Sequence, residues 1–66
     1  MLTVGEKIRN ARIKKGISQR KLAQKIGVDQ GAISRMESGQ RGITDIQKVK
    51  ISKILEEDLM TLFYGQ

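Results

Sequence analysis

The sequence predicts an all-α fold, with five short helices in a single domain of residues 1–66. Two observations favour this class. Apolar residues recur at the spacing of a helix face, and no segment sustains the strict alternation of apolar and polar residues that is typical of a strand. Polar residues that cap helices also precede the apolar segments, and glycines that end helices follow most of them. These start and stop signals assign each helix in turn.

The first helix is predicted over about residues 4–15. Thr3 and Glu6 form the pattern of a capping box, in which two side chains satisfy backbone N–H groups of the first turn. Lys14 and Lys15 complement the partial negative charge of a helix C-terminus. Gly16 follows them and can adopt the left-handed conformation that ends a helix.

The second and third helices are predicted over about residues 19–26 and 30–38. Ser18 and Asp29 are the expected N-caps, because their side-chain oxygens can accept hydrogen bonds from the first turn. Gly27 and Gly39 follow the last turns. Only three or four residues therefore separate the two helices.

The fourth and fifth helices are predicted over about residues 45–55 and 59–64. Thr44 and Gln47 form a second capping box, and Asp58 is the expected N-cap of the last helix. Isoleucines and leucines spread over a wide arc of the fourth helix. This distribution predicts that the fourth helix is buried on several sides.

The composition excludes several kinds of function. A chain of 66 residues builds a small core and has little room for a deep catalytic cleft. The lack of Cys and His removes disulfides, thiolate metal sites and the most common general base. We therefore expect no enzymatic activity, metal, cofactor or small-molecule substrate. The sequence shows no signal peptide pattern and no apolar run of about 20 residues, so we expect a cytoplasmic protein without a membrane partner.

The positive charge is concentrated in the first two thirds of the chain. Residues 1–41 contain ten Lys or Arg and three Asp or Glu residues, a net charge of +7, whereas residues 42–66 contain three and four, a net charge of −1. A basic front half favours a polyanionic partner such as nucleic acid over a merely solvated basic surface.

The segment from Gln19 to Met36 has the pattern of a helix-turn-helix unit. Two helices joined this tightly cross at a steep angle, typically about 90–120°. Such a crossing needs a small residue at the closest approach, which is Ala23, and a left-handed residue in the turn, which is Gly27. The apolar residues expected to hold the unit together are Leu22, Ala23, Ile26, Val28, Ile33 and Met36.

This pattern resembles the helix-turn-helix family of phage Cro and repressor proteins, also called the xenobiotic-response-element type. The resemblance covers nearly the whole chain and implies a compact five-helix, lambda-repressor-like DNA-binding domain. The chain departs from the family in the fourth helix, where Ile46 and Val49 replace the usual leucine stripe in a different register. The matching residues are Gly5 to Arg9, Arg12, Lys15 to Gln19, Leu22, Ala23, Gly27, Val28, Ile33, Ser34, Arg35, Glu37, Gly39, Ile51, Leu55, Leu59 and Leu62.

The outer side of the third helix carries the predicted base contacts. At 100° per residue, its small and polar residues lie opposite its apolar ones. Taken alone, such a face is more often simply solvated, but within this motif it points toward the major groove. The resemblance implies that Gln30 is the leading base reader and Arg35 the second, since Gln pairs with adenine and Arg with guanine. The full predicted set is Gln30, Gly31, Ser34 and Arg35.

Two further sets of residues follow from the resemblance. Arg12 and Glu37 are expected to form a structural ion pair between the first helix and the end of the third, and not a functional site. Phosphate contacts are expected at the start of the second helix and after the third. The predicted phosphate-contacting residues are Ser18, Gln19, Arg20, Lys21, Ser38, Gln40, Arg41 and Gly42.

The resemblance also implies how the protein acts. Because one helix reads only a few base pairs, family members form two-fold dimers on palindromic sites with half-sites about 34 Å apart. We therefore expect a homodimeric, sequence-specific regulator of transcription, most simply a repressor, bound to double-stranded DNA. The alternative is a protein-interaction module, such as an antitoxin-like partner, with the same fold. The predicted dimer interface is Leu59, Met60, Phe63 and Tyr64. The alternative is that Leu59 and Phe63 belong to the core with Leu62, which leaves Met60 and Tyr64 as the exposed apolar edge.

Overall fold

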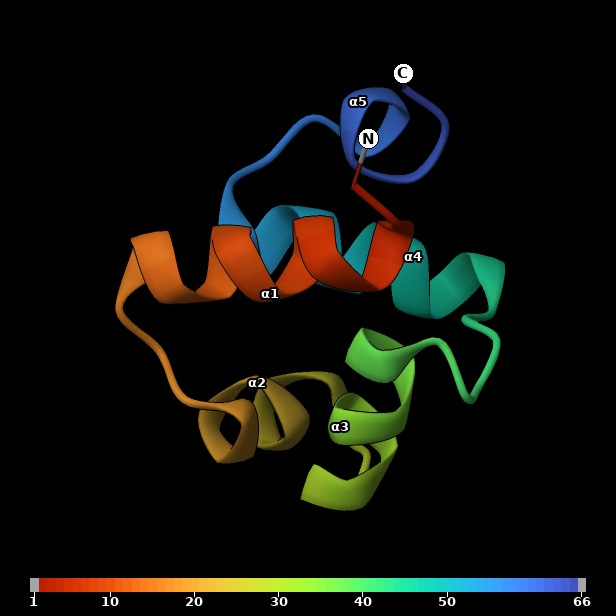
Figure 1. The fold of residues 1–66 in the computed structure, drawn as a ribbon. Helices are drawn as coiled ribbons and strands as arrows, with labels where there is room; N and C mark the ends of the chain where they lie inside the picture. Colours follow the sequence, from red (N-terminus) through yellow and green to blue (C-terminus); the bar gives the residue numbers. More distant parts are fainter. Residues whose placement is uncertain (1, 66) are drawn as a thin grey trace.

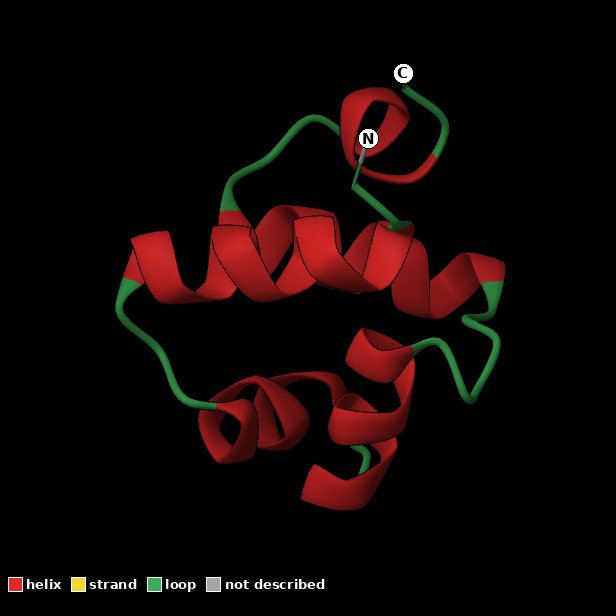
Figure 2. Cartoon of the chain, in the orientation of Figure 1, coloured by secondary structure: helices red, strands yellow, loops and turns green. Residues whose placement is uncertain are grey.

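Each helix begins at a polar residue whose side chain accepts a backbone hydrogen bond from three residues further along. The computed structural model describes residues 2–65, so the predicted domain of residues 1–66 extends one residue beyond the described part at each end. The N-caps are the predicted Thr3, Ser18, Asp29, Thr44 and Asp58. The helices are α1 (Val4–Lys15), α2 (Gln19–Ile26), α3 (Gln30–Ser38), α4 (Asp45–Leu55) and α5 (Leu59–Phe63), as Figure 2 shows. The predicted all-α, five-helix class is confirmed.

Glycines end α1, α2 and α3, whereas residues with side chains end α4 and α5. Gly16, Gly27 and Gly39 end α1, α2 and α3 in the left-handed conformation, with φ between 78° and 81°. Glu56 ends α4 at a φ of 55°, a conformation that L-residues with side chains rarely adopt. Helix α5 was predicted to reach residue 64, but it ends at Phe63, and Tyr64 has left the helical conformation.

The helices form three levels around one core, as Figure 1 shows. α1 and α4 lie side by side in the middle, α5 lies on one side of them, and α2 and α3 lie on the other. Four helices each contribute one large, fully buried side chain, namely Ile8, Leu22, Ile33 and Ile51. Helix α3 packs against α1 as well as against α2, so both helices set its position.

Gly5 of α1 lies directly against the backbone of α3, and the carbonyl oxygen of Glu37 is the atom nearest to where a Cβ would be. A Cβ atom at this position would lie only 2.7 Å from the carbonyl oxygen of Met36 in α3. The sequence indicated Ala23 as the small residue at a close crossing, and Ala23 is indeed buried. It did not indicate Gly5. The missing side chain at Gly5 lets the first turn of α1 rest directly on the backbone near the end of α3.

The prediction that α4 is buried on several sides holds for the helix, but not for the whole of its apolar arc. Ile46 is 71% exposed and Val49 is 40% exposed, whereas Ile51 and Leu55 are buried. Within the described residues α4 packs against α1, α2 and α5, and its remaining side faces solvent. The wide apolar arc therefore includes a surface as well as a core face.

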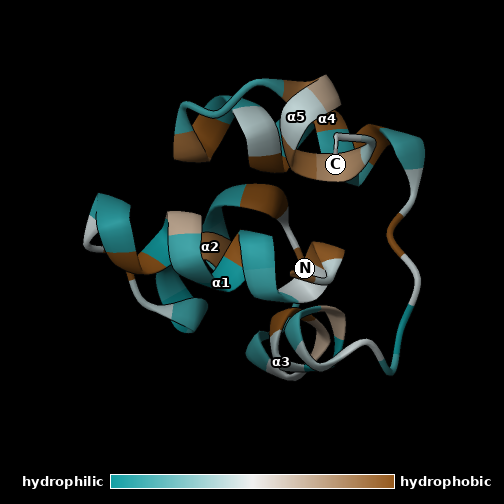
Figure 3. Cartoon of the chain, turned by 45° about the horizontal axis from the view of Figure 1, so that its top comes forward, coloured by the Kyte–Doolittle hydropathy of each residue, from teal (hydrophilic) through white to brown (hydrophobic). Residues whose placement is uncertain are grey.

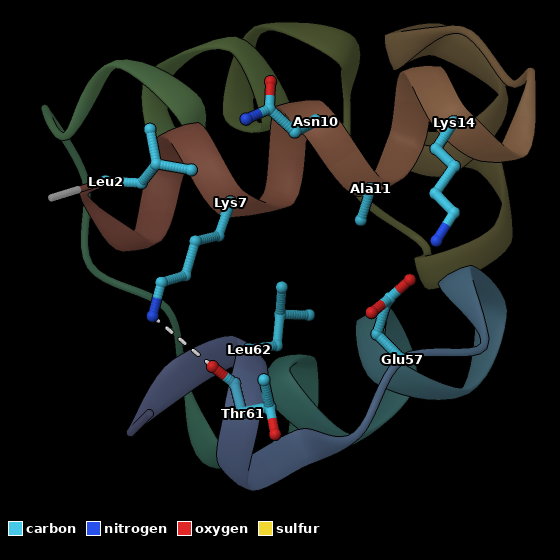
Figure 4. A pocket seen from close by; sticks show the side chains of 8 residues that line it. All are labelled: Leu2, Lys7, Asn10, Ala11, Lys14, Glu57, Thr61 and Leu62. Carbon is cyan, nitrogen blue, oxygen red and sulfur yellow. Dashed lines mark hydrogen bonds between the residues drawn. The ribbon is translucent and has the colours of Figure 1, made fainter. Parts of the chain in front are cut away.

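Helix α5 is joined to α1 by Lys7. Its Nζ atom donates hydrogen bonds to the carbonyl oxygens of Gly65 (2.6 Å) and Thr61 (3.4 Å), and Figure 4 shows the second of these. A hollow of about 320 Å³ lies beside this contact, between α1 and α5 and away from α3. No helix among residues 2–65 is long and apolar enough to cross a lipid bilayer.

Candidate nucleic-acid interface

The two sides of α3 differ completely in burial. Its inner side is buried against α1 and α2 by Ala32, Ile33, Met36 and Glu37. Its outer side is open to solvent: Gly31 is half-buried, and Gln30, Ser34, Arg35 and Ser38 are exposed. The predicted base-contacting residues therefore lie together on one accessible helix face.

The turn between α2 and α3 holds this face at a defined angle. The backbone N–H groups of Gly27 and Val28 both donate to the carbonyl oxygen of Ala23, at 2.9 and 3.0 Å. The side-chain Oδ1 of Asp29 then accepts a 2.7 Å hydrogen bond from the Ala32 N–H. The end of α2 and the start of α3 are thus fixed by local hydrogen bonds, which place α3 directly after a rigid turn.

A buried ion pair ties the end of α3 to α1. The guanidinium of Arg12 donates to both carboxylate oxygens of Glu37, from Nε at 2.7 Å and from Nη2 at 3.2 Å. Their side chains are only 11% and 5% exposed. Arg12 also donates to the carbonyl oxygen of Ile17 in the link before α2. The pair therefore has a structural position, because it joins α1, α3 and the approach to α2.

Gln19 extends the buried network toward solvent. Its side-chain Nε2 donates a 3.0 Å hydrogen bond to Oε1 of Glu37, which the sequence did not indicate because the two residues are 18 positions apart. One amide hydrogen of Gln19 remains available for another acceptor. A polar hollow of about 290 Å³ lies at this point, lined by Arg9, Arg12, Gln19, Ser34, Glu37 and Ser38.

Arg35 lies across Gly31 toward the N-cap of its own helix. Its Nη2 atom is 3.9 Å from Oδ1 of Asp29. A Cβ atom at Gly31 would lie 3.1 Å from Nη1 of Arg35 and 3.3 Å from the same Asp29 oxygen. The sequence predicted Gly31 as a base-contacting residue and Asp29 only as an N-cap. The structure brings both residues against the guanidinium of Arg35.

The predicted phosphate-contacting residues lie at the start of α2 and at or after the end of α3, but their polar groups are not equally free. The exposed ones include Arg20 and Lys21 on α2 and Arg41 and Gly42 after α3. The hydroxyl of Ser38 donates to the carbonyl oxygen of Arg35. Because its single proton is used inside the helix, Ser38 has no donor for a phosphate without breaking that bond.

The backbone N–H of Gln40 is also engaged, since it donates to the carbonyl oxygen of Arg35 at 2.9 Å. Only the side chain of Gln40 can therefore donate to a phosphate. At the start of α2, the hydroxyl of Ser18 accepts from the Lys21 N–H but keeps its own proton for donation. At Gln40 the side chain, rather than the backbone amide, is thus the donor to be tested, whereas Gly42 can offer only its backbone amide.

The residues predicted for a dimer interface do not all reach the surface. Met60 and Tyr64 are 61% and 53% exposed, and Leu59 is half-buried. Phe63 is instead 7% exposed within the core, so it offers little area to a partner. Figure 3 shows that hydrophobic residues make up most of α5, and the buried side of so short a helix uses Leu62 and Phe63 together.

Tyr64 is held against α4 by Lys48. The Nζ atom of Lys48 donates a 2.9 Å hydrogen bond to the Tyr64 hydroxyl and lies 4.7 Å from the centre of its ring. The hydrogen bond raises the pKa of Lys48. The exposed aromatic ring of Tyr64 is therefore already oriented on the surface formed by α4 and α5.

Comparisons with known proteins agree with this geometry. Residues 8–62 match a family described as helix-turn-helix. The P22 c2 repressor protein, solved in complex with a synthetic operator, is 30% identical over the full length of both chains, with a TM-score of 0.91. The restriction-modification controller protein C.AhdI from Aeromonas hydrophila is 32% identical over 91% of each chain, with a TM-score of 0.84.

A third solved structure shares the fold at lower identity. The clp gene regulator ClgR from Corynebacterium glutamicum is 24% identical over 89% of this chain and 63% of its own, with a TM-score of 0.85. No curated protein matches the sequence significantly. The fold is thus common to proteins whose names describe regulators.

Proposed function

The chain belongs to the helix-turn-helix family of the Cro and C1 type, and from this membership we propose that it is a sequence-specific, double-stranded-DNA-binding repressor of transcription. The observation that carries the proposal is the division of α3. Its inner side is used by packing and by the ion pair to Arg12, whereas its polar outer side makes no side-chain hydrogen bond or ion pair to another helix among residues 2–65. The similarity to a repressor solved with its operator supports the same reading.

Base recognition is assigned to the outer side of α3. Gln30 lies in the first turn and is exposed, as helix-turn-helix residues that contact adenine must be. Arg35 is one and a half turns further on and can donate two parallel hydrogen bonds to guanine. Ser34 lies between them, where it can reach a base or the backbone.

Phosphate binding is assigned to the two ends of this face. Ser18 and Gln19 open α2, and the latter is braced by Glu37 while keeping one amide hydrogen free. Arg20 and Lys21 add positive charge beside them. On the other side Arg41 is exposed in the link after α3. Donors at both ends would grip the DNA backbone and fix the register of α3.

We further propose that two copies bind a palindromic operator. Each copy would present α3 to one half-site, about 34 Å from the other. The exposed Met60 and Tyr64, with the half-buried Leu59, form the apolar edge assigned to the dimer contact. A symmetric contact of this kind would double the number of base pairs that are read.

DNA binding is tested by selection of bound sequences from a random duplex pool, followed by fluorescence anisotropy at two salt concentrations. We expect one recurrent, palindromic site and at least a tenfold loss of affinity between about 50 and 200 mM salt, because phosphate contacts release counterions. Sedimentation of the complex should give two chains per site. Affinity that is independent of salt and of sequence would contradict the proposal and favour a protein-docking module.

A further inference from the structure

The position of Arg35 over Gly31 carries an inference that rests on the proposed function. We propose that Asp29 is a positioning residue, which holds the guanidinium of Arg35 ready for a guanine, and that Gly31 is required because it leaves room for that guanidinium. Asp29 would then affect which sequence is bound without contacting a base itself. Specificity at this one guanine would depend on Asp29, Gly31 and Arg35, of which only Arg35 reads the base.

The carboxylate of Asp29 is itself fixed in place. Its Oδ1 atom accepts the N-cap hydrogen bond from Ala32 at 2.7 Å and lies 3.9 Å from Nη2 of Arg35. The cap therefore determines where the negative charge is, and the charge determines where the guanidinium lies. These two tasks are chemically separable, because Asn caps a helix about as well as Asp but carries no charge.

Gly31 occupies a position where glycine is otherwise unfavourable. It lies within the first turn of α3, and its backbone conformation is an ordinary helical one, so no positive φ requires glycine there. A helical Gly lowers stability relative to Ala. A Cβ would lie 3.1 Å from Nη1 of Arg35, closer than ordinary van der Waals contact. The space above Gly31 is therefore filled by the guanidinium.

The contact between Arg35 and Asp29 is expected to contribute to DNA binding and not to the stability of the fold. The side chains of Arg35 and Asp29 are 50% and 78% exposed, and ion pairs this exposed contribute little to folding. A long Arg side chain loses rotamer freedom when it binds, and a contact that restricts it beforehand lowers that cost. A carboxylate on the DNA-facing side also repels phosphates, which weakens binding to unrelated sequences.

The variants that test the inference are Asp29→Asn and Gly31→Ala. The affinity of each is measured for two duplexes: the site selected by the wild-type protein, and the same site in which the guanine read by Arg35 is replaced. We expect each variant to lower the ratio of the two affinities by about three- to tenfold, within the range that one bidentate contact controls. Asp29→Asn should leave the thermal midpoint unchanged, and Gly31→Ala should raise it. A lower affinity ratio between the two sites, in a protein that is as stable as the wild type or more so, indicates a positioning role.

Asp58→Asn is the matched control, since Asp58 is also an N-cap aspartate but begins α5, on the other side of the molecule. It should leave the affinity ratio unchanged. Asp29→Asn should also have no effect on the ratio in an Arg35→Ala background, because the residue it positions is gone. Without DNA, Asp29→Asn should shift the NMR signal of the Arg35 Nε–H group.

Two outcomes would overturn the inference. In the first, Asp29→Asn strengthens binding to both sites by the same factor with and without Arg35, which would make Asp29 a source of bulk charge only. In the second, Gly31→Ala keeps the wild-type ratio. If the wild-type protein itself prefers no sequence, the proposed function fails instead. This result differs from the two outcomes above, because it is seen without any substitution.

Discussion

Two arginine–carboxylate pairs involve α3, and they differ in every respect except their chemistry. Arg12 and Glu37 are in contact at 2.7 Å with side chains 11% and 5% exposed. Arg35 and Asp29 are 3.9 Å apart with side chains 50% and 78% exposed. The first pair joins two helices, and the second stays within one helix and its cap. Burial, and not residue type, therefore separates the pair that holds α3 in place from the pair that can open when α3 meets DNA.

The largest effect is expected from breaking the buried pair. Glu37→Ala would leave the Arg12 guanidinium buried without its partner and would remove the acceptor of Gln19. The expected loss is about 3–5 kcal/mol of unfolding free energy, which can unfold a domain this small. Urea denaturation followed by circular dichroism measures it. Asp29→Asn, which removes the charge of the exposed pair but keeps an N-cap, should stay within about 0.5 kcal/mol, and equal losses in both variants would contradict the comparison.

The second effect concerns Arg35 alone. Arg35→Ala should cost about 1–3 kcal/mol of discrimination at one base position while the unfolding free energy stays nearly constant, because the side chain is half exposed. Competition binding against the set of single-base variants of the selected site identifies the base position that Arg35 reads. A uniform loss of affinity across all these sites would show that Arg35 contacts phosphate and would remove it from the base readers.

A smaller effect is expected at Arg41, in the link after α3. Arg41→Ala should weaken binding to every sequence alike and reduce the slope of log affinity against log salt by about 0.9, the value for one phosphate contact. Lys53→Ala is the control, since Lys53 is an exposed cation on α4 outside the predicted site. If both variants change the slope equally, Arg41 acts only through net charge.

The smallest effect concerns two carboxylates outside both pairs, Glu6 and Asp58, which accept hydrogen bonds from backbone N–H groups at the starts of α1 and α5. Hydrogen bonds from the backbone N–H groups of Thr3 and Thr61 lower the pKa values of Glu6 and Asp58 below their ordinary values of 4.5 and 3.8. Groups with a lowered folded pKa stabilise the protein above the ordinary value and lose this contribution as pH falls through the folded one.

The thermal midpoint should therefore begin to fall as acidification passes about pH 4.5 and should keep falling below pH 3.8. Thermal scans between pH 6 and pH 3 measure it. Variants Glu6→Gln and Asp58→Asn should fall less steeply in this window. A wild-type midpoint that is flat over the whole window would contradict the role of these carboxylates as charged caps.

Local features of the fold could be predicted because they are encoded within a few residues. The capping boxes at Thr3 and Thr44 and the glycines after α1, α2 and α3 gave the helix ends directly. Glu56 could not be predicted as a left-handed cap, since nothing in a glutamate indicates that conformation. The burial of Phe63 also depends on how one turn of α5 is rotated, which a five-residue helix hardly specifies.

The candidate site was predictable in its location but not in its internal contacts. The polar side of α3 follows from the helical period, and Arg12 with Glu37 follows from the family resemblance. The hydrogen bond from Gln19 to Glu37 joins residues from different helices, and no local pattern encodes it. Asp29 and Arg35 are six residues apart, outside the three- and four-residue spacing at which helix neighbours usually pair.

We propose that the exposed side of α3 reads DNA bases while its buried side holds the helix in place. The most direct measurement is the NMR structure of the protein bound to its selected duplex, through nuclear Overhauser contacts between side chains and base protons. We expect contacts from Gln30 and Arg35 to base edges in the major groove, with the hydrogen bonds between Arg12 and Glu37 unchanged. A complex in which the outer side of α3 makes no contact with bases would contradict it.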